Sequence, residues 1–416
     1  MNDKPYNQAK EKYAKYGVDT DKVLDRLKGV PVSINCWQGD DFHGFETEES
    51  SLSGGILVTG DHPGIPSNID EFRQDTEKAF SMIPGQKKLA LEAMYGDYKG
   101  KLKERNEMKK EHFTSWVDWA QQNGVGIDIN PTLFSHPKAS GGYTLASKDK
   151  DIRNYWIEHV KLCREICNYI GSELNQVCFD NLWVPDGSKD INVTKLDHRE
   201  ILIQAFDEIF EKKYPRENMD DALESKLFGI GVESYTVGSL ELYISYAVQK
   251  GLQVTLDTGH FHPTEKVSDK ISALLPFFEG LQLHVTRGVR WDSDHVPIIE
   301  DELVAIMQEI VRANALDKVF IGTDFFDASI SRIGAWAIGT RTIQKSLMLA
   351  LLEPTKTLKD YEREGNNFAR LASLENLKFM PFEAVWDRYC EMQGVPKDDQ
   401  LIDTVMEYER NVILKR

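Results

Sequence analysis

Cysteine is scarce in this sequence, and long apolar runs are missing from it. Five cysteines are scattered over 416 residues, without the spacing of a metal knuckle or a disulfide framework. Two of them, Cys163 and Cys167, fall on one expected amphipathic helix. No apolar run approaches the roughly 20 residues that span a bilayer, and the polar start of the chain is unlike a signal peptide. We therefore expect buried, reduced thiols in a cytoplasmic protein that does not enter a membrane.

Basic side chains are also in the minority. The 50 Lys and Arg residues face 67 Asp and Glu residues, which gives a formal net charge of −17. This balance argues against nucleic acid and against an anionic membrane surface as partners, because both are bound through Lys and Arg. Neither GxGxxG nor GxxxxGKS/T occurs, so no phosphate-binding loop is indicated. The composition fits an enzyme with a neutral small-molecule substrate, or one that uses cations as intermediaries.

Short apolar runs alternate with longer amphipathic runs along most of the chain. The expected strands are residues 31–37, 88–95, 125–131, 176–184, part of 221–231, 252–260, 281–285 and 318–326. The expected helices are residues 70–83, 112–123, 152–170, 198–214, 240–250, 265–279, 300–315 and 332–353. Eight strands alternating with eight helices predict a parallel sheet closed into a (β/α)8 TIM barrel. A doubly wound open sheet is the alternative, weakened by the missing phosphate loop.

Additional helices are expected at both ends of this α/β chain. The first residues are polar and follow a helical pattern, and the segment after 353 is charged and helical. We predict a barrel domain at 1–353 with an N-terminal helical extension. The remainder, 354–416, is predicted to be a C-terminal helical appendage that packs on the barrel or on a neighbouring subunit.

Carboxylates and imidazoles gather just beyond the last three expected strands. The stretch LDTGHFHP (256–263) ends one strand, and WDSDH (291–295) lies in the loop after the next. In such a barrel the chemistry lies at the C-terminal ends of the strands. The residues expected at this rim are Asp257, His260, His284, Asp292, Asp294 and Asp324. His262 and His295 are expected to support or cap them.

This ligand set contains oxygen and nitrogen but no thiolate, which selects ions such as Mn²⁺, Mg²⁺, Co²⁺ or Zn²⁺. The set is larger than one small ion takes from a protein, so two ions that share a bridging carboxylate are predicted. Asp257 is the best candidate for the bridge, because D-T-G-H lets its carboxylate and His260 face the same cavity. Taken singly, such a side chain is more often a cap or a structural group. Their coincidence at one rim favours metal.

Several longer motifs resemble the bacterial L-rhamnose isomerase family. They are NCWQGDD (35–41), WVPDG (183–187), ESKLFGIG (224–231), ESYTVGS (233–239), GHFHPTE (259–265), VRWDSDHV (289–296), DFFDASI (324–330) and IGTR (338–341). The resemblance runs over nearly the whole chain, and that family is similar to D-xylose isomerase in fold and metal arrangement. It implies a (β/α)8 barrel, two divalent ions with manganese typical, a homotetramer, and aldose–ketose isomerisation of L-rhamnose to L-rhamnulose.

Carried over residue by residue, the resemblance implies a structural ion and a catalytic ion. The structural ion would be held by Glu224, Asp257, His284 and Asp324. The catalytic ion would be held by Asp257, His260, Asp292 and Asp294. Lys226 would contact O1 of the sugar, and Trp183 would form an aromatic wall. Periodicity alone would extend the fifth strand and favour Glu233 at the rim, whereas the family's Glu-x-Lys pattern favours Glu224.

The implied reaction moves a carbonyl from C1 to C2 and needs charge stabilisation on both oxygens. A divalent ion would orient O1 and O2 as a Lewis acid while hydride moves from C2 to C1, and a metal-bound water would shuttle the proton. Lys226 would add an electrostatic clamp at O1. With His260 and Asp324 it forms the predicted catalytic set. A cis-enediol route, in which a carboxylate abstracts the C2 proton, is the alternative.

The expected sugar pocket has an apolar wall and two departures from the family. Trp37, Phe134 and Trp183 are available to contact the 6-deoxy methyl group. The family usually has His where this chain has Asn35 and Glu92, and the second of these histidines faces the sugar and is a candidate for opening the ring. Glu92, a predicted substrate-binding residue, changes the charge and the reach at that place.

These departures keep other functions open. An isomerase of a different aldose is the nearest alternative, and a non-catalytic metal- or sugar-binding barrel is another. A metal-dependent phosphodiesterase on the same barrel is the third, and the acidic balance argues against it. The charged run 96–110 is expected to be a solvated helix, with a mobile lid over the site as the alternative.

Overall fold

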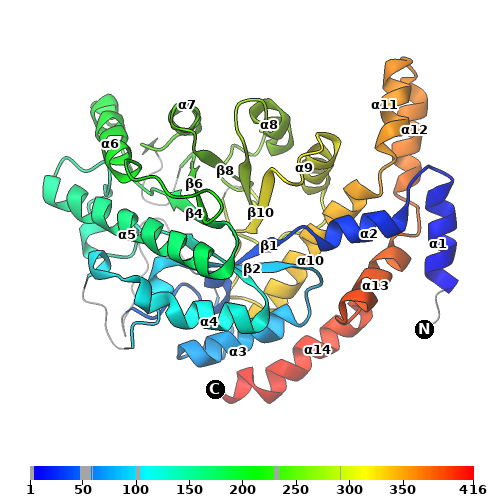
Figure 1. Cartoon of the computed structure of the whole chain (residues 1–416), viewed down its shortest axis with the longest axis horizontal. Helices are drawn as coiled ribbons and strands as arrows, with labels where there is room; N and C mark the ends of the chain where they lie inside the picture. The colour runs from blue at the N-terminus through cyan, green and yellow to red at the C-terminus, as the bar shows by residue number, and fades with distance from the viewer. Residues whose placement is uncertain (1–3, 47–57, 59, 100–103, 229–233, 291) are drawn as a thin grey trace.

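Eight parallel strands form one closed barrel in the computed structural model, which describes residues 4–46, 58, 60–99, 104–228, 234–290 and 292–416. The order around the barrel is β1-β10-β9-β8-β6-β4-β3-β2, with helices on the outside (Figure 1). The strands are β1 (Val32–Asn35), β2 (Lys87–Glu92), β3 (Gly126–Asn130), β4 (Cys178–Trp183), β6 (Met219–Glu224), β8 (Gln253–Asp257), β9 (Leu281–Val285) and β10 (Val319–Thr323). The predicted fold class is confirmed.

The barrel strands are buried along nearly their whole length. Helices cover their outer face and side chains fill the inside, which explains why they read as continuous apolar runs. The register brings the strand ends level with one another: Trp183 pairs with Glu224, and Asp257 pairs with His284. Side chains at these positions therefore meet at one rim.

One helix follows each barrel strand and covers the barrel. These helices are α3 (Ile69–Phe80), α4 (Thr114–Asn123), α5 (Lys150–Leu174), α6 (Lys195–Ile209), α7 (Leu240–Lys250), α8 (Val267–Leu274), α9 (Asp301–Arg312) and α10 (Arg332–Leu351). Asn68 and Asp149 begin α3 and α5 by accepting hydrogen bonds from the first backbone amides, as good N-cap residues do. All eight predicted helices lie where the sequence pattern put them.

Further helices flank the barrel at both ends of the chain. α1 (Lys4–Ala14) and α2 (Thr20–Lys28) precede β1, and α11 (Thr355–Arg363), α12 (Asn367–Leu377), α13 (Phe382–Gln393) and α14 (Asp398–Asn411) follow α10. α13 packs against α1 and α10, and the Tyr408 hydroxyl on α14 donates to Asp75 on α3 at 2.7 Å. Figure 1 shows α13 and α14 running along one side of the barrel. The domain boundary at 353 falls between α10 and α11.

A two-stranded antiparallel sheet, β5 (Gly187–Ser188) with β7 (Tyr235–Thr236), was not predicted. It joins the loops that follow β4 and β6. All five cysteines are free and buried, as expected. No helix in the described ranges is long and apolar enough to cross a membrane.

Candidate active site

Four neighbouring strands, β6, β8, β9 and β10, end in side chains that are able to bind a metal ion. Glu224 and Asp257 are the last residues of β6 and β8, His284 lies near the end of β9, and Asp324 follows β10. One ligand atom from each of the four lies within 4.8 Å of the others. The strand order alone accounts for this convergence, because these strands are adjacent in the barrel.

A second group consists of Asp257, His260 and Asp292, whose ligand atoms also lie within 4.8 Å of one another. Asp257 therefore belongs to both groups, as predicted for a bridging carboxylate. Gly259 permits this approach: a Cβ at its position would lie 2.8 Å from Oδ1 of Asp292 and 2.7 Å from a methyl group of Thr286. The D-T-G-H spacing thus allows the loop after β9 to reach the end of β8.

Asp294 lies beside these two groups and belongs to neither of them among the described residues. Its carboxyl lines the same cavity. Burial, followed by the negative charges of Asp292 and Asp324, raises its pKa well above the usual value. Its backbone oxygen accepts a hydrogen bond from Phe326 at 3.0 Å, which joins the loop after β9 to the segment after β10. Its role as a ligand remains a prediction.

The two histidines are oriented by their neighbours. Nδ1 of His260 lies 3.0 Å from the Ser225 carbonyl oxygen, an acceptor that requires the proton on Nδ1, so Nε2 is free to face Asp292 at 3.5 Å. Nδ1 of His284 lies 3.3 Å from Glu224 and 3.4 Å from Asp324. A backbone carbonyl behind a histidine is a common way to orient a metal ligand.

Several polar atoms of this cluster are buried without a hydrogen-bond partner within the described part of the chain. They are Oε1 of Glu224, Oδ2 of Asp257, Nδ1 of His284 and Oδ1 of Asp292. Buried polar atoms in native proteins are nearly always paired, so a concentration of unpaired atoms needs an explanation. All four atoms are oxygen or imidazole nitrogen, the donors that suit divalent ions such as Mn²⁺ or Mg²⁺. The residues present fit a divalent metal.

The pKa values report an excess of buried negative charge. Burial raises the pKa of Asp257 well above its usual range, and the charges of Asp324 and Glu224 add to this effect. Burial alone would lower the pKa of His284, yet Glu224 and Asp324 raise it to about 10. Burial opposes ionisation of Asp324 too, but the neighbouring His284 imidazole, 3.4 Å away, brings the pKa down to about 2. A divalent cation would neutralise this charge.

Lys226 lies beside this cluster. Its Nζ is 2.6 Å from Oδ2 of Asp292 and 4.9 Å from the ring centre of Trp183. Burial works against the ammonium form, but Asp292 and Asp294 outweigh it and raise the pKa. Lys226 therefore stays positively charged at neutral pH.

Above the cluster lies a cavity of about 40 Å³, lined by aromatic rings and by the ligand groups. The predicted pocket residues Trp37, Glu92, Phe134 and Trp183 all line it. Nε1 of Trp37 and Nε1 of Trp183 are buried and lack an acceptor among the described side and main chains. Two unsatisfied N–H donors at the wall of a cavity suit a ligand rich in hydroxyl groups.

Glu92 places a carboxyl group in this cavity. It accepts a hydrogen bond from the Thr132 hydroxyl at 2.6 Å. Burial raises its pKa well above the usual value. A raised pKa favours the protonated carboxyl, the form that can donate a proton, which makes Glu92 a general-acid candidate.

Asn35, the second departure, does not line the cavity. Its side-chain amide donates to the Phe325 carbonyl oxygen at 2.5 Å, and its oxygen accepts from Thr323. It therefore ties β1 to β10, where the barrel closes.

Of the two histidines expected to be supporting, His262 is bonded to Thr264 at 2.7 Å and His295 to Ser293 at 2.9 Å. Glu233 lies outside the described residues.

Sequence reasoning missed two aromatic residues of the cavity, Phe42 and Phe326. The Phe42 ring is stacked on Trp37 at 5.3 Å and meets Phe134 and Phe326 edge-on at 5.7 and 5.0 Å. Phe42 has φ +61°, which is rare for a bulky residue and is a feature of functional sites. The available signal was an apolar residue directly after the acidic pair of NCWQGDD.

Similarity to known proteins extends over the entire chain. The family model described as L-rhamnose isomerase matches residues 1–416. An L-rhamnose isomerase of Mannheimia succiniciproducens is 52% identical over 99% of this chain and 98% of its own length, and one of Bacteroides thetaiotaomicron is 49% identical over 100% and 99%.

Among solved structures, a D-psicose 3-epimerase from Clostridium cellulolyticum H10 aligns at 15% identity and a TM-score of 0.44. The alignment covers 67% of this chain and 91% of the other. The strand order of the closed sheet identifies the fold as a barrel. Because the family model and the relatives match from end to end, this chain belongs to the L-rhamnose isomerase family, a family of aldose–ketose isomerases that act on a small sugar.

Proposed function

We propose that this protein converts L-rhamnose to L-rhamnulose with two divalent ions per subunit, manganese being the first choice and Co²⁺, Zn²⁺ or Mg²⁺ the alternatives. The observation that carries the proposal is the pair of ligand groups that share Asp257 below a cavity walled by aromatic rings. One ion would be held by Glu224, Asp257, His284 and Asp324. The other would be held by Asp257, His260, Asp292 and Asp294. When bound, the ions polarise both sugar oxygens as Lewis acids.

The protein's own residues orient the sugar and stabilise charge during a 1,2-hydride shift from C2 to C1. Lys226 donates from Nζ to O1, where negative charge develops. His260 and Asp324 would each hold one of the ions and would contribute to the chemistry in that way. The indole N–H groups of Trp37 and Trp183 donate to sugar hydroxyls, which would satisfy their unpaired state. Phe134 supplies apolar surface for the methyl group.

Ring opening requires a proton at the ring oxygen before hydride moves. Glu92 is in the cavity, and burial raises its pKa, which favours the protonated carboxyl. We assign the donation of this proton to Glu92. The hydrogen bond from Thr132 orients the carboxyl.

The decisive experiment is isomerisation of L-rhamnose by metal-stripped protein, with and without Mn²⁺. Activity that returns with the ion supports the proposal. Binding of the ion without turnover of any aldose would favour a non-catalytic barrel. No binding of a divalent ion would contradict the metal assignment.

A second candidate, an isomerase of a different aldose, is favoured by the carboxyl group of Glu92 in the pocket. A panel of aldoses compared by kcat/KM separates the two. Glu92→His and Glu92→Gln are matched variants, because the first restores the family's usual residue and the second removes the acidic proton at constant size. A best substrate other than L-rhamnose, in the unaltered protein, would favour the second candidate.

We also propose that the protein forms a homotetramer and is located in the cytoplasm. The chain would divide into a barrel domain at 1–353 and a helical appendage at 354–416. Support for the assembly comes from α12, which buries none of its side chains in the monomer. Phe368, Leu371 and Phe379 are 82%, 60% and 82% exposed, an apolar surface that a neighbouring subunit would cover. The buried free thiols support the location. Sedimentation velocity tests the subunit number.

A further inference from the structure

Arg105 is a charged residue that the fold buries almost completely. It lies in a short 3-10 helix, Arg105–Glu107, within the charged run that the sequence suggested to be a solvated helix or a lid. Only 2% of the residue is exposed. A buried guanidinium is costly unless an opposite charge and acceptors for its N–H groups surround it. Its partners therefore show what it does.

All three guanidinium nitrogens of Arg105 have partners. Nε and Nη2 donate to the carboxylate of Glu46, at 3.1 and 2.5 Å. Nη1 donates to the backbone oxygens of Thr132 and Phe134 at 2.8 and 2.5 Å, and Nη2 reaches the oxygen of Ser135 at 3.3 Å. One side chain thus binds three carbonyl groups of the loop after β3 and an acid of the loop after β1.

These attachment points belong to the residues that shape the cavity. Phe134 lines it, and the Thr132 hydroxyl holds the carboxyl of Glu92. Glu46 lies four residues beyond Phe42, whose ring packs on Phe134. Arg105 itself does not line the cavity. It acts on the site through the loops that it holds and through its charge, which opposes the rise in the pKa of Glu92.

We propose that Arg105 is a positioning residue of the sugar pocket, which fixes the ring of Phe134 and, through Thr132, the carboxyl of Glu92. The inference rests on the proposed function, because it takes the cavity to be the place where the sugar binds. It also gives residues 104–110 a role, since this segment brings the guanidinium to the two loops.

Arginine is required here for its geometry as well as for its charge. Its planar fork presents five N–H donors in fixed directions, whereas a lysine ammonium has three donors at one point. Lys at position 105 would keep the charge beside Glu46 but could not bind both that carboxylate and three carbonyl oxygens. Arg105→Lys therefore loosens the loop after β3 without leaving an uncompensated buried carboxylate.

Arg164 offers a matched control in the same chain. It is also 2% exposed, with Nε and Nη2 donating to Asp221 at 2.7 and 2.9 Å. Its Nη1 donates to the backbone oxygens of Ile209 and Lys212 at 2.6 and 2.9 Å. These partners lie on the outside of the barrel, and Arg164 does not line the cavity. Arg164→Lys damages the fold in a similar way without touching the pocket loops.

The experiment compares Arg105→Lys, Arg164→Lys and the unaltered full chain, all loaded with Mn²⁺, by steady-state kinetics and thermal unfolding. We expect Arg105→Lys to lower kcat/KM for L-rhamnose by about tenfold or more, because small misplacements of binding groups have large kinetic effects. The metal content should not change. Arg164→Lys should lower Tm and leave kcat/KM within about twofold, as expected for a remote site.

A milder variant keeps the inference testable if Arg105→Lys fails to fold. Thr132→Val removes the hydroxyl that holds Glu92 at nearly constant size and should reproduce part of the loss in kcat/KM. Equal kcat/KM for the Arg105→Lys variant and the unaltered chain would overturn the inference but leave the proposed function intact. If Arg105→Lys does not fold, an unchanged kcat/KM in Thr132→Val would overturn the inference. Absence of turnover by the unaltered chain would instead refute the proposed function, and amide hydrogen exchange at residues 132–135 would then decide. Faster exchange there in Arg105→Lys than in Arg164→Lys supports positioning, and equal exchange contradicts it.

Discussion

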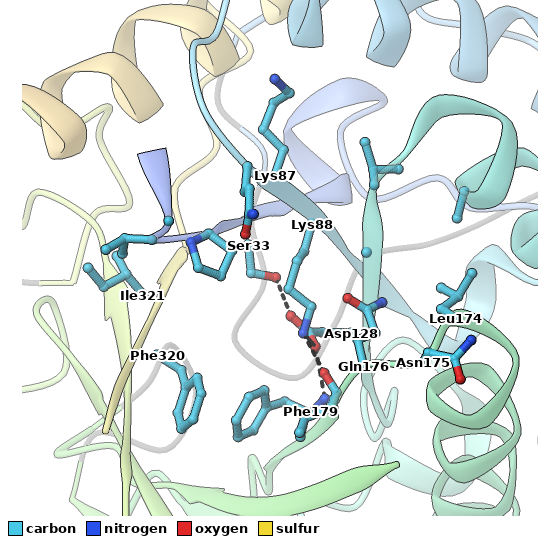
Figure 2. A pocket seen from close by; sticks show the side chains of 18 of the residues that line it. Ser33, Lys87, Lys88, Asp128, Leu174, Asn175, Gln176, Phe179, Phe320 and Ile321 are labelled. Atoms are coloured by element: carbon cyan, nitrogen blue, oxygen red, sulfur yellow. Dashed lines mark hydrogen bonds and ion pairs between the residues drawn. The ribbon is translucent and has the colours of Figure 1, made fainter. Parts of the chain in front are cut away.

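The two ends of the barrel differ in how their buried charges are paired. At the C-terminal end, Glu224, Asp257, His284 and Asp292 each have a polar atom that finds no partner in the described part of the chain, and they lie beside a cavity of about 40 Å³. At the N-terminal end the cavity is far larger, about 710 Å³, but its buried charges are paired with one another (Figure 2).

The pairing at the N-terminal end is centred on Asp128. Its carboxylate accepts hydrogen bonds from the Ser33 hydroxyl at 2.6 Å, from the backbone amide of Phe179 at 2.8 Å and from the ammonium of Lys88. Lys88 also donates to the Val177 carbonyl oxygen at 2.7 Å. Among the described residues that line this cavity, the buried polar atom without a partner is Nε2 of Gln176, which belongs to a neutral amide.

The comparison teaches that cavity size alone is a poor guide to the functional end of this barrel. Empty volume shows only where side chains do not meet. Charges that are buried and left unpaired cost free energy in the isolated chain, so they indicate a ligand that compensates them. By this criterion the smaller cavity is the active site, in agreement with the usual position of chemistry in such barrels.

Asp257→Asn should give the largest effect, because this carboxylate belongs to both ligand groups. We expect kcat/KM to fall by about a thousandfold, more than the loss typical of residues behind a ligand. The metal-free variant should unfold no more easily than the metal-free parent, because the substitution removes a crowded negative charge. Kinetics and calorimetry in EDTA measure the two quantities. Retention of most activity would contradict the conclusion that the C-terminal end of the barrel is the functional end.

Asp128→Asn at the opposite end should have the opposite effects, a large loss of stability and little loss of activity. Losing the charged partner of buried Lys88 is expected to destabilise the fold by about 3 kcal/mol, while kcat/KM stays within about twofold because the chemistry lies at the other end. Urea unfolding and steady-state kinetics on the same preparation provide the test. A large loss of activity in folded protein would show that the two ends are not independent.

The stability of the metal-free protein should fall as pH rises. A raised pKa means that the folded chain holds a proton that the unfolded chain releases. The stabilisation from protonated His284 is therefore complete below pH 6.5 and is lost as pH rises through about 10. The raised pKa of Asp257 acts in the same direction above pH 3.8. We expect a loss of about 2 kcal/mol between pH 7 and pH 9.

The metal-loaded protein is the control for this pH dependence. An ion displaces the protons from its ligands, so its Tm should vary less between pH 7 and pH 9 than the Tm measured in EDTA. Parallel profiles with and without Mn²⁺ would show that the cluster is not the titrating site.

Ser33→Ala should give the smallest effect. It removes one of the three donors to Asp128 and leaves the Lys88 ion pair intact, so we expect a loss of about 1 kcal/mol and unchanged kinetics. Urea unfolding beside Asp128→Asn measures the difference. A loss as large as that of Asp128→Asn would mean that the hydroxyl, rather than the ion pair, organises the N-terminal end.

The barrel was predictable because its strands are buried on both faces and therefore read as uninterrupted apolar runs. The end of the fifth strand was not. Periodicity continued past Glu224, but β6 stops there, because the Ser225 carbonyl turns to His260 and Lys226 turns to Asp292. These are long-range contacts that no local pattern contains. The Glu-x-Lys motif supplied the missing information.

Other features escaped prediction for related reasons. The strands β5 and β7 contain two residues each, too few for any periodicity. The run around Arg105 looked solvated because its composition is charged, and the acid that pairs with Arg105 lies 59 residues earlier in the chain. The candidate ligands, in contrast, were visible because they lie at the ends of apolar strands or in the loops that follow them.

Strand β10 has a double role that affects how the protein is made on the ribosome. Asp324, which follows it, is the last of the candidate ligands to be synthesised, and β10 itself pairs with β1 to close the barrel. The loop after β1 carries Trp37 and Phe42 to the cavity. A nascent chain that stops before β10 therefore lacks both a complete metal group and a closed pocket. Synthesis of β10 and Asp324 completes the metal-binding group and the closed pocket together. A truncated product that lacks them should therefore have no partial activity.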